Sequence, residues 1–415
     1  MLAELFPRAH ARFASLPLLG PHLDGFVVWL CSQGYPRLPI RLRIREMPRL
    51  DARLRRSRGR RLGILSRAQL MEFAPRDSQE DIILAATVRS LACYLDAHGL
   101  LARPAPTPRE QMVAAYRGYL ERVRGLADST LAHHCCTASD LLAFLDFDGD
   151  LAVLRRVDQR QIEMFVRASG TRLSRASLQH VVAHLRSFLR FLASRGESAR
   201  GLDSAIDTPR VYRGERLPRS LPWETVQAFL AAIDRSTPMG RRDYAMFLLV
   251  ATYGLRTSEV AALRLDDIEW RAGRMRVPRP KSKTPILLPL TEEVGAALLD
   301  YLRHARPHLP YREVFLRVRA PAGPIAPTAV TEAFQAWSRR GALAIPYQGP
   351  HCLRHSLAVH LLRQGTSLKV RQGTSLKAIG DLLGHRSAES TCVYLRLHVD
   401  DLRDAAIELP LEARQ

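Results

Sequence analysis

Residues 243–290 read DYAMFLLVATYGLRTSEVAALRLDDIEWRAGRMRVPRPKSKTPILLPL, and the pattern of this stretch changes midway. The first part predicts a helix from Asp243 to Tyr253, a stop at Gly254 and a second helix through Leu263. The second part holds three strand-like pieces, IEW, RMRV and ILLPL, separated by RAG and PKSKTP. This order predicts helices followed by a small antiparallel sheet.

Helical patterns also dominate the residues before this stretch. The clearest helix is expected from Ser174 to Ser194, with one apolar stripe made of Leu178, Val181, Val182, Leu185, Phe188, Leu189 and Leu192. A second is expected from Ser78 to His98, with Ile82, Ile83, Ala86, Leu91 and Leu95 near one face. Another begins near Ser129 as its N-cap. The expected fold class is therefore mainly α, with a small antiparallel β-sheet in the C-terminal part of the chain.

A chain of 415 residues is too long for one core, so several domains are expected. Residues 1–105 form an extra N-terminal region, in which the basic run ARLRRSRGRR is either a DNA arm or a solvated loop. The Pro-rich string ARPAPTP separates this region from a helical domain over 106–205. A basic linker over 206–220 contains TPRVYRGERLPRS and leads into a third domain over 221–415.

The charge balance points to a polyanionic partner. The formal net charge is +21 and the isoelectric point is about 10.6, values that indicate nucleic acid binding. Candidate DNA contacts in the helical domain and the linker are Arg175, Arg186, Arg190, Arg213 and Arg216. The six cysteines show no disulfide spacing, and no apolar run is long enough for a membrane span. We expect a cytoplasmic protein with no membrane partner and no metal site.

The last 160 or so residues hold a set of cationic, imidazole and phenol groups suited to phosphodiester chemistry without a metal. They are, in order, Arg256, Lys281, His351, Arg354, His385 and Tyr394. Arginine forks suit bidentate contact with phosphate oxygens. The chain has only four lysines, yet Lys281 and Lys283 lie together in RPKSKTP, which favours an acid there because lysine can give up a proton.

The spacing of these residues resembles the tyrosine recombinase family, the phage-type integrases. The matching strings are GLRTSE at 254–259, HCLRH at 351–355, LLGH ending at His385, and a tyrosine nine residues later. The resemblance spans roughly 217–402. It implies that the small antiparallel sheet belongs to a catalytic domain over 221–415, and that the helical region over 106–205 is the family's SAM-like, DNA-binding core-binding domain. It implies a site-specific DNA recombinase or integrase that needs no cofactor.

The resemblance also implies a role for each residue. Tyr394 attacks the scissile phosphate and forms a 3′-phosphotyrosyl link, while His351 accepts its proton and His385 hydrogen-bonds a non-bridging oxygen. Lys281 is the residue expected to protonate the 5′ oxygen, because its separation of eight residues from Pro289 is the one that the family shows. Lys283 is the alternative. Glu259 either orients the site or forms a plain i,i+3 ion pair with Arg256.

The implied partners are double-stranded DNA, other copies of the chain in a homo-tetramer on DNA, and possible accessory recombinases. Mobilisation of a genetic element, including transposition, fits the extra N-terminal region. Two alternatives stay open. One is relaxation of DNA in the manner of a type IB topoisomerase, and the other is a DNA-binding relic that has lost its activity.

The relic alternative arises from a tandem repeat. RQGTSLK occurs at 363–369 and again at 371–377. With Val370 between the copies, the repeat has a period of eight residues and is called the octapeptide below. It places Arg354 and His385 31 residues apart. Without one copy, this interval is the usual one of the family. If the extra copy lengthened a helix, it would displace His385 and the residues after it by about 12 Å. The copy therefore either bulges out of the fold or disrupts the site.

Overall fold

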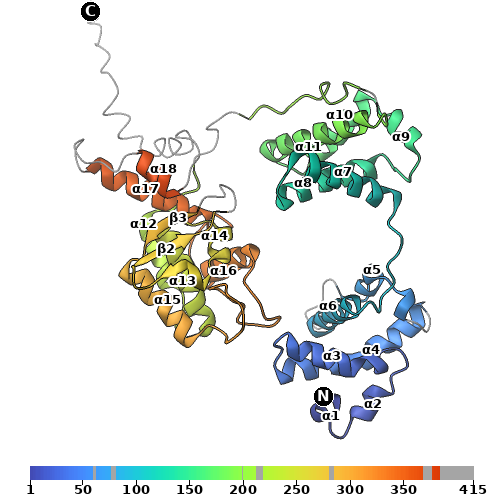
Figure 1. Cartoon of the computed structure of the whole chain (residues 1–415), viewed down its shortest axis with the longest axis horizontal. Helices are drawn as coiled ribbons and strands as arrows, with labels where there is room; N and C mark the ends of the chain where they lie inside the picture. The colour runs from blue at the N-terminus through green and yellow to red at the C-terminus, as the bar shows by residue number, and fades with distance from the viewer. Residues whose placement is uncertain are drawn as a thin grey trace, which may run out of the picture. The chain divides into compact units, whose positions relative to one another are not determined.

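The structure, a computed structural model, describes residues 1–58, 62–75, 81–198, 200–211, 218–279, 285–367 and 376–383 (Figure 1). Helices dominate these residues and three short strands form one sheet, which confirms the predicted fold class. The chain divides into two compact units, residues 102–215 and a unit made of 1–101 and 216–415. Among the described residues, no helix has the length and apolar character that crossing a membrane requires.

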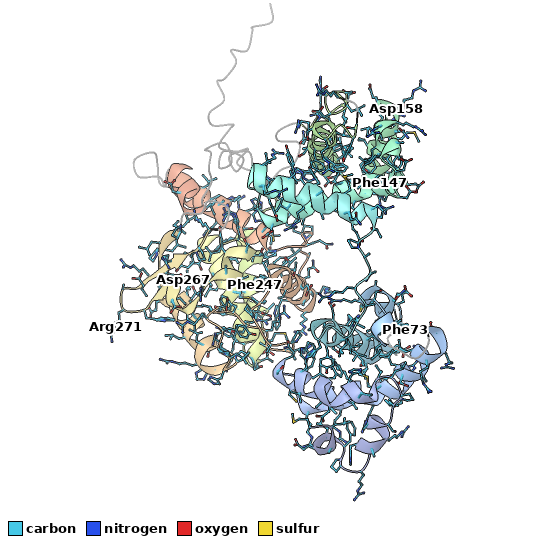
Figure 2. The ribbon with its side chains drawn as sticks, turned by 45° about the vertical axis from the view of Figure 1, so that its right-hand side comes forward. Phe73, Phe147, Asp158, Phe247, Asp267 and Arg271 are labelled. Atoms are coloured by element: carbon cyan, nitrogen blue, oxygen red, sulfur yellow. The ribbon has the colours of Figure 1, made fainter. Side chains whose placement is uncertain are left out.

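Three large hydrophobic cores organise these units, and a small fourth cluster joins α17 (His351–Ser367) to α18 (Leu376–Leu383). Figure 2 labels one aromatic residue belonging to each large core: Phe73, Phe147 and Phe247. The first core is built from residues 2–101, the second from 112–206 and the third from 221–353.

The N-terminal core is covered by three longer helices, α3 (Gly20–Ser32), α4 (Arg37–Arg58) and α6 (Ile82–Ala97), and by several short ones. The short ones are α1 (Leu2–Leu5), α2 (His10–Ala14), η1 (Leu62–Ile64) and α5 (Arg67–Met71). The run ARLRRSRGRR was predicted to be a DNA arm or a solvated loop. Up to Arg58 the loop interpretation is wrong, because the run continues α4, whereas the DNA-arm interpretation stays a prediction. The apolar residues of α4 recur every three or four positions, and Ile44, Met47, Leu50 and Leu54 are all buried.

The predicted inner face of α6 needs a correction. Ile82 and Ile83 are exposed, whereas Leu84, Val88 and Leu91 are buried. The helix begins at Ile82. The side chains of its first two residues point to solvent, and the buried stripe starts at Leu84.

Residues 102–215 form a helical bundle, as predicted. Its helices are α7 (Pro108–Arg124), α8 (Asp128–Phe144), α9 (Leu151–Arg155), α10 (Gln159–Gly170) and α11 (Arg175–Ser194). Ser174 caps α11 by accepting a hydrogen bond from the backbone N–H of Ser177, and the helix ends at Ser194 as expected. The N-cap predicted at Ser129 is wrong: α8 begins at Asp128, with Ala127 before it.

The third core is wrapped by helices around one small sheet. The helices are α12 (Trp223–Ala231), α13 (Pro238–Tyr253), α14 (Thr257–Ala262), η3 (Leu265–Asp267), α15 (Glu292–His304), α16 (Pro327–Arg340), α17 (His351–Ser367) and α18 (Leu376–Leu383). Helix α13 starts five residues before the predicted Asp243, because Thr237 caps it and Pro238 fits its first turn.

The sheet has the predicted antiparallel order β1-β2-β3. Its strands are β1 (Ile268–Glu269), β2 (Arg274–Val277) and β3 (Ile286–Pro289). Met275 pairs with Leu288, and Met275 and Val277 point into the core while their neighbours face outward. The β2–β3 connection carries Lys281 and Lys283, and both lie outside the described residues.

Candidate active site

The first site residue, Arg256, stands at the N-cap of α14. Its backbone N–H donates to Glu259 Oε2 at 2.8 Å, and its Nη1 donates to Glu259 Oε1 at 2.6 Å. The Glu259 side chain is 2% exposed and that of Arg256 is 25% exposed. A buried carboxylate therefore holds Arg256 through two hydrogen bonds, one from the backbone and one from the guanidinium, and leaves part of the guanidinium open to solvent, which is more than a surface i,i+3 pair does.

Arg354 lies one turn into α17 and is fully buried. Its Nη1 donates to the carbonyl of Gly254, and its Nη2 donates to the carbonyl of Leu383. These carbonyls lie at the C-terminal ends of α13 and α18, where helix carbonyls lack intrahelical partners and carry partial negative charge. Arg354 thus joins three helices through one guanidinium.

Gly254 is required where these helices meet. Its φ of 64° is left-handed, and a Cβ at this position would lie 2.6 Å from Leu383 Cδ2. Glycine therefore provides both the turn that brings Arg256 to the N-cap of α14 and the space into which α18 packs.

His351 is the first residue of α17 and is exposed. Its ring meets that of His355 edge to face, with centroids 4.5 Å apart. His351 and Arg256 line the same hollow, which has a volume of about 360 Å³. The other lining residues are Val250, Leu255, Thr257, Ser258, Thr331, Gly349 and Pro350. The fold therefore brings one guanidinium and one imidazole from positions 95 residues apart to a single open hollow.

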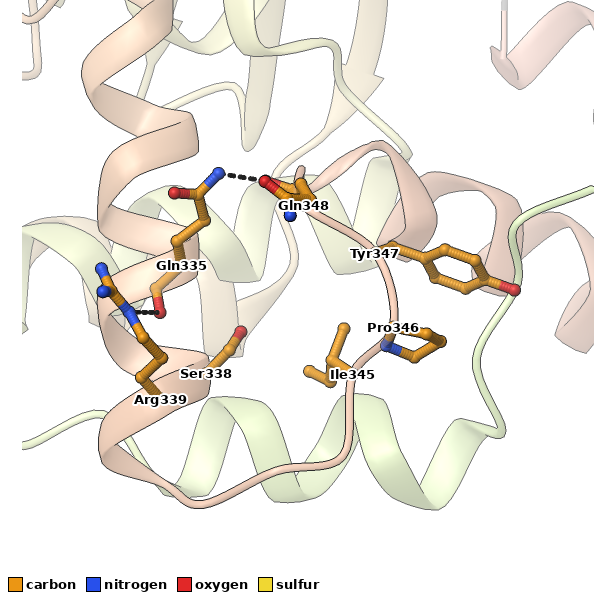
Figure 3. A pocket seen from close by; sticks show the side chains of 7 residues that line it. All are labelled: Gln335, Ser338, Arg339, Ile345, Pro346, Tyr347 and Gln348. Atoms are coloured by element: carbon orange, nitrogen blue, oxygen red, sulfur yellow. Dashed lines mark hydrogen bonds between the residues drawn. The ribbon is translucent and has the colours of Figure 1, made fainter.

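A second hollow, of about 300 Å³, lies beside α16 (Figure 3). Gln335 Nε2 donates to the carbonyl of Gln348 at 2.8 Å, and Arg339 Nε donates to the carbonyl of Gln335 at 3.2 Å. Its lining contains one charged side chain and no imidazole. It thus lacks the paired groups of the first hollow.

Arg279 was not singled out from the sequence, yet it lies beside the predicted site. It follows β2, it is 9% exposed, and its Nη2 donates to the carbonyl of Leu382 at 2.7 Å. The pKa of Arg279 is lowered, chiefly by burial. The Glu259 carboxylate opposes this shift, and the positive charge of Arg256 adds to it. The one sequence signal for this residue is its position two residues before Lys281.

The predicted residues His385 and Tyr394, like Lys281 and Lys283, lie outside the described residues. Helix α18 ends two residues before His385, and Arg354 holds that end. The described part of the site is thus Arg256, Glu259, His351 and Arg354.

The predicted DNA-binding arginines are only partly described, since Arg213 and Arg216 lie outside the described residues. Arg175 is exposed at the start of α11. Arg186 Nη2 donates to the carbonyl of Ile206 at 2.5 Å, and Arg190 Nη1 contacts Asp203 Oδ2 at 3.4 Å. Both of the latter have partners in the segment that follows α11, and Arg186 is the less suited to phosphate contact because it is half-buried.

Two family profiles match the chain. The phage integrase family matches residues 219–400, and the SAM-like N-terminal domain of phage integrases matches residues 113–196. The chain is 34% identical over 421 residues to y4rA of Sinorhizobium fredii, a protein named as an integrase/recombinase, and the match covers 98% of this chain and 99% of the relative. It is 29% identical to the tyrosine recombinase XerD of Listeria monocytogenes, covering 68% of this chain and 91% of XerD.

Solved structures share the fold at lower identity. The XerH site-specific recombinase bound to palindromic difH substrate aligns with a TM-score of 0.56 and 15% identity, over 73% of this chain and 97% of XerH. A λ integrase (75–356) dimer bound to a COC′ core site aligns with a TM-score of 0.52 and 18% identity, over 68% of this chain and 94% of that one. The chain belongs to the phage integrase family, the tyrosine recombinases, whose members are enzymes that break and rejoin DNA strands.

Proposed function

We propose that the chain is a site-specific DNA recombinase that cuts and rejoins DNA through a 3′-phosphotyrosyl link to Tyr394 and so mobilises a genetic element. The observation that carries this proposal is the shared hollow of Arg256 and His351, with the buried Arg354 joining the helix ends nearby. A scissile phosphate in this hollow meets a positive charge and a proton acceptor at once.

Charge on the pentavalent phosphorus is matched by arginine. Arg256 is the better placed of the two arginines, because its guanidinium is partly exposed and is oriented by Glu259. Arg354 has two nitrogens on carbonyls, so direct contact of its fork with phosphate requires phosphate oxygens to replace the carbonyl of Gly254 or Leu383. Arg354 does not line the hollow, so until then it acts on the phosphate through its charge alone.

The proton transfers follow the direction of the bond changes. The Tyr394 oxygen attacks phosphorus and gives its proton to His351, while the bond from phosphorus to the 5′ oxygen breaks. Lys281, or its neighbour Lys283, protonates the departing 5′ oxygen, and His385 hydrogen-bonds a non-bridging oxygen. A 5′-hydroxyl then attacks phosphorus and gives its proton to the neutral lysine. The bond from phosphorus to the Tyr394 oxygen breaks, and His351 returns a proton to that oxygen. One phosphodiester replaces another, so rejoining needs no external energy source.

Binding to double-stranded DNA rests on charge. The chain has a net charge of +21. Its contacts with phosphates release counterions from DNA, so the affinity for DNA should fall steeply as the salt concentration rises. Arg175, Arg190, Arg213 and Arg216 are the proposed contacts. A homo-tetramer on DNA, with possible accessory recombinases, completes the proposal; one solved neighbour is a λ integrase tetramer bound to a Holliday junction.

One observation bears on the relic alternative. The carbonyl of Leu383, which comes after both copies of the octapeptide, remains within hydrogen-bonding reach of Arg354, which precedes them. The first turn of α17 and the end of α18 are thus joined across the repeat, and this favours an active enzyme.

The test begins with selection of binding sites from random DNA duplexes, using the Tyr394→Phe protein to avoid cleavage. Nicked suicide duplexes of the selected sequence are then incubated with the unchanged protein. We expect a covalent protein–DNA adduct that the Tyr394→Phe protein does not form, and recombinant products from intact sites. Relaxation of supercoiled plasmid without recombinants would support the topoisomerase alternative, and binding without any adduct would support the relic.

A further inference from the structure

Two arginines from distant parts of the sequence end on consecutive carbonyls of α18. Arg279 Nη2 donates to Leu382, and Arg354 Nη2 donates to Leu383. Arg279 is 103 residues from its partner and Arg354 is 29. The last carbonyls of a helix lack intrahelical partners and carry partial negative charge, so they suit guanidinium groups.

Apolar packing adds to this attachment. Leu383 is 0% exposed and packs with Ala358, Val359 and Leu362 of α17. The end of α18 is therefore held by two charged hydrogen bonds and one buried side chain.

The burial of the Arg279 guanidinium lowers the stability of the fold, so stability alone does not explain its position. Arg279 is 9% exposed, and its buried Nε has no hydrogen-bond partner in the described part of the chain. Desolvation of a charge is compensated only when its donors are satisfied. An arginine kept in such a place points to a role in setting geometry.

The tandem octapeptide makes that geometry demanding. Helix α17 ends at Ser367 and α18 begins at Leu376, and the two copies overlap both helices. Eight further helical residues would carry the later carbonyls about 12 Å away. Contacts of hydrogen-bond length at Leu382 and Leu383 are incompatible with such a shift.

We propose that Arg279 is a positioning residue for the reaction: together with Arg354 it fixes the end of α18, two residues before His385, independently of the number of octapeptide copies. This inference rests on the proposed function. Arg279 also precedes Lys281 by two residues, so the same guanidinium couples the β2–β3 connection to α18.

The experiment compares Arg279→Leu and Arg279→Lys with the unchanged chain, and repeats each in a chain lacking residues 363–370. The matched control is Arg276→Leu, because Arg276 lies three residues earlier in the chain, on β2, and its side chain is 61% exposed. The readouts are the single-turnover cleavage rate on the nicked suicide duplex, the Kd for that duplex, and amide hydrogen exchange of residues 376–383.

We expect Arg279→Leu to lower the cleavage rate by about 10- to 100-fold, the effect of a displacement of about 1 Å, while the Kd changes by less than about threefold. Lysine should restore part of the rate, since it can still donate to Leu382. Exchange of the α18 amides should rise at least about tenfold in Arg279→Leu and stay unchanged in Arg276→Leu. The loss of rate should be larger in the full chain than in the shortened one.

Unchanged exchange of α18 in Arg279→Leu would overturn the proposal, as would cleavage by that variant at the unchanged rate. Equal loss of rate and of DNA affinity would also overturn it, because that pattern indicates a general weakening of the fold. If the unchanged chain forms no adduct, the proposed function fails, and the exchange measurement still decides whether Arg279 anchors α18.

Discussion

Replacing Glu259 by Gln removes one negative charge from the position that holds Arg256. The carboxylate accepts two hydrogen bonds from Arg256, one from the backbone N–H and one from Nη1. A glutamine side chain has one acceptor oxygen, which can accept from only one of the two Arg256 donor groups in this geometry. Its NH₂ group then faces the other donor and cannot accept a hydrogen bond. One of the two hydrogen bonds is therefore lost in Glu259→Gln.

The magnitude can be worked from the burial of the pair. A hydrogen bond to a charged group contributes about 1.5–3 kcal/mol, and the middle of this range applies because Glu259 is buried while Arg256 is 25% exposed. If the lost hydrogen bond contributes about 2 kcal/mol to stabilising the transition state, the cleavage rate falls about 30-fold. The free energy of unfolding should fall by a similar or smaller amount.

The assay is single-turnover cleavage of the nicked suicide duplex at saturating protein, with urea unfolding measured in parallel. The control is Glu292→Gln, which removes the same charge from an exposed position in the first turn of α15. We expect the control to cleave at the unchanged rate. Cleavage by Glu259→Gln at that same rate would refute the orienting role of Glu259.

Three further predictions concern stability. Asp243→Asn should lower the free energy of unfolding by about 3 kcal/mol in a urea titration, since it leaves the buried Arg242 without its charged partner. Gly254→Ala should lower it by about 2 kcal/mol and slow cleavage, because alanine is strained at a φ of 64° and its Cβ meets Leu383. Burial and neighbouring histidines lower the pKa of His184 from 6.5 to about 4. The unfolded chain therefore binds more protons between these values, and α11 should lose protection from hydrogen exchange as the pH falls from 6.5 towards 4, but not in a His184→Gln variant.

The sequence predicts those elements whose pattern is local. Helix α11 has a long apolar stripe and a serine cap, and the strands alternate inward and outward residues, so both were predicted correctly. The inner face of α6 was misjudged because its first two isoleucines are apolar yet lie in an exposed first turn. The helical nature of the basic run was missed because its arginines conceal the spacing of the leucines between them.

The contacts between distant residues could not be predicted. Nothing local to Arg354 indicates that its guanidinium serves the carbonyls of Gly254 and Leu383, since both partners are backbone groups brought near by packing. The contact from Arg279 to Leu382 joins residues 103 positions apart, and the sequence around either residue does not indicate it. The sequence names the groups that the chemistry needs, whereas the packing of α17 and α18 determines which of them meet.

The central claim is that these cationic and imidazole groups serve one phosphate that becomes bonded to Tyr394. The most direct test is to digest the covalent protein–DNA adduct with trypsin and nuclease and to locate the nucleotide by mass spectrometry. We predict a single modified peptide, SAESTCVYLR, in which Tyr394 carries a 3′-linked nucleotide. A nucleotide on any other residue, or one linked through its 5′ phosphate, would contradict the account.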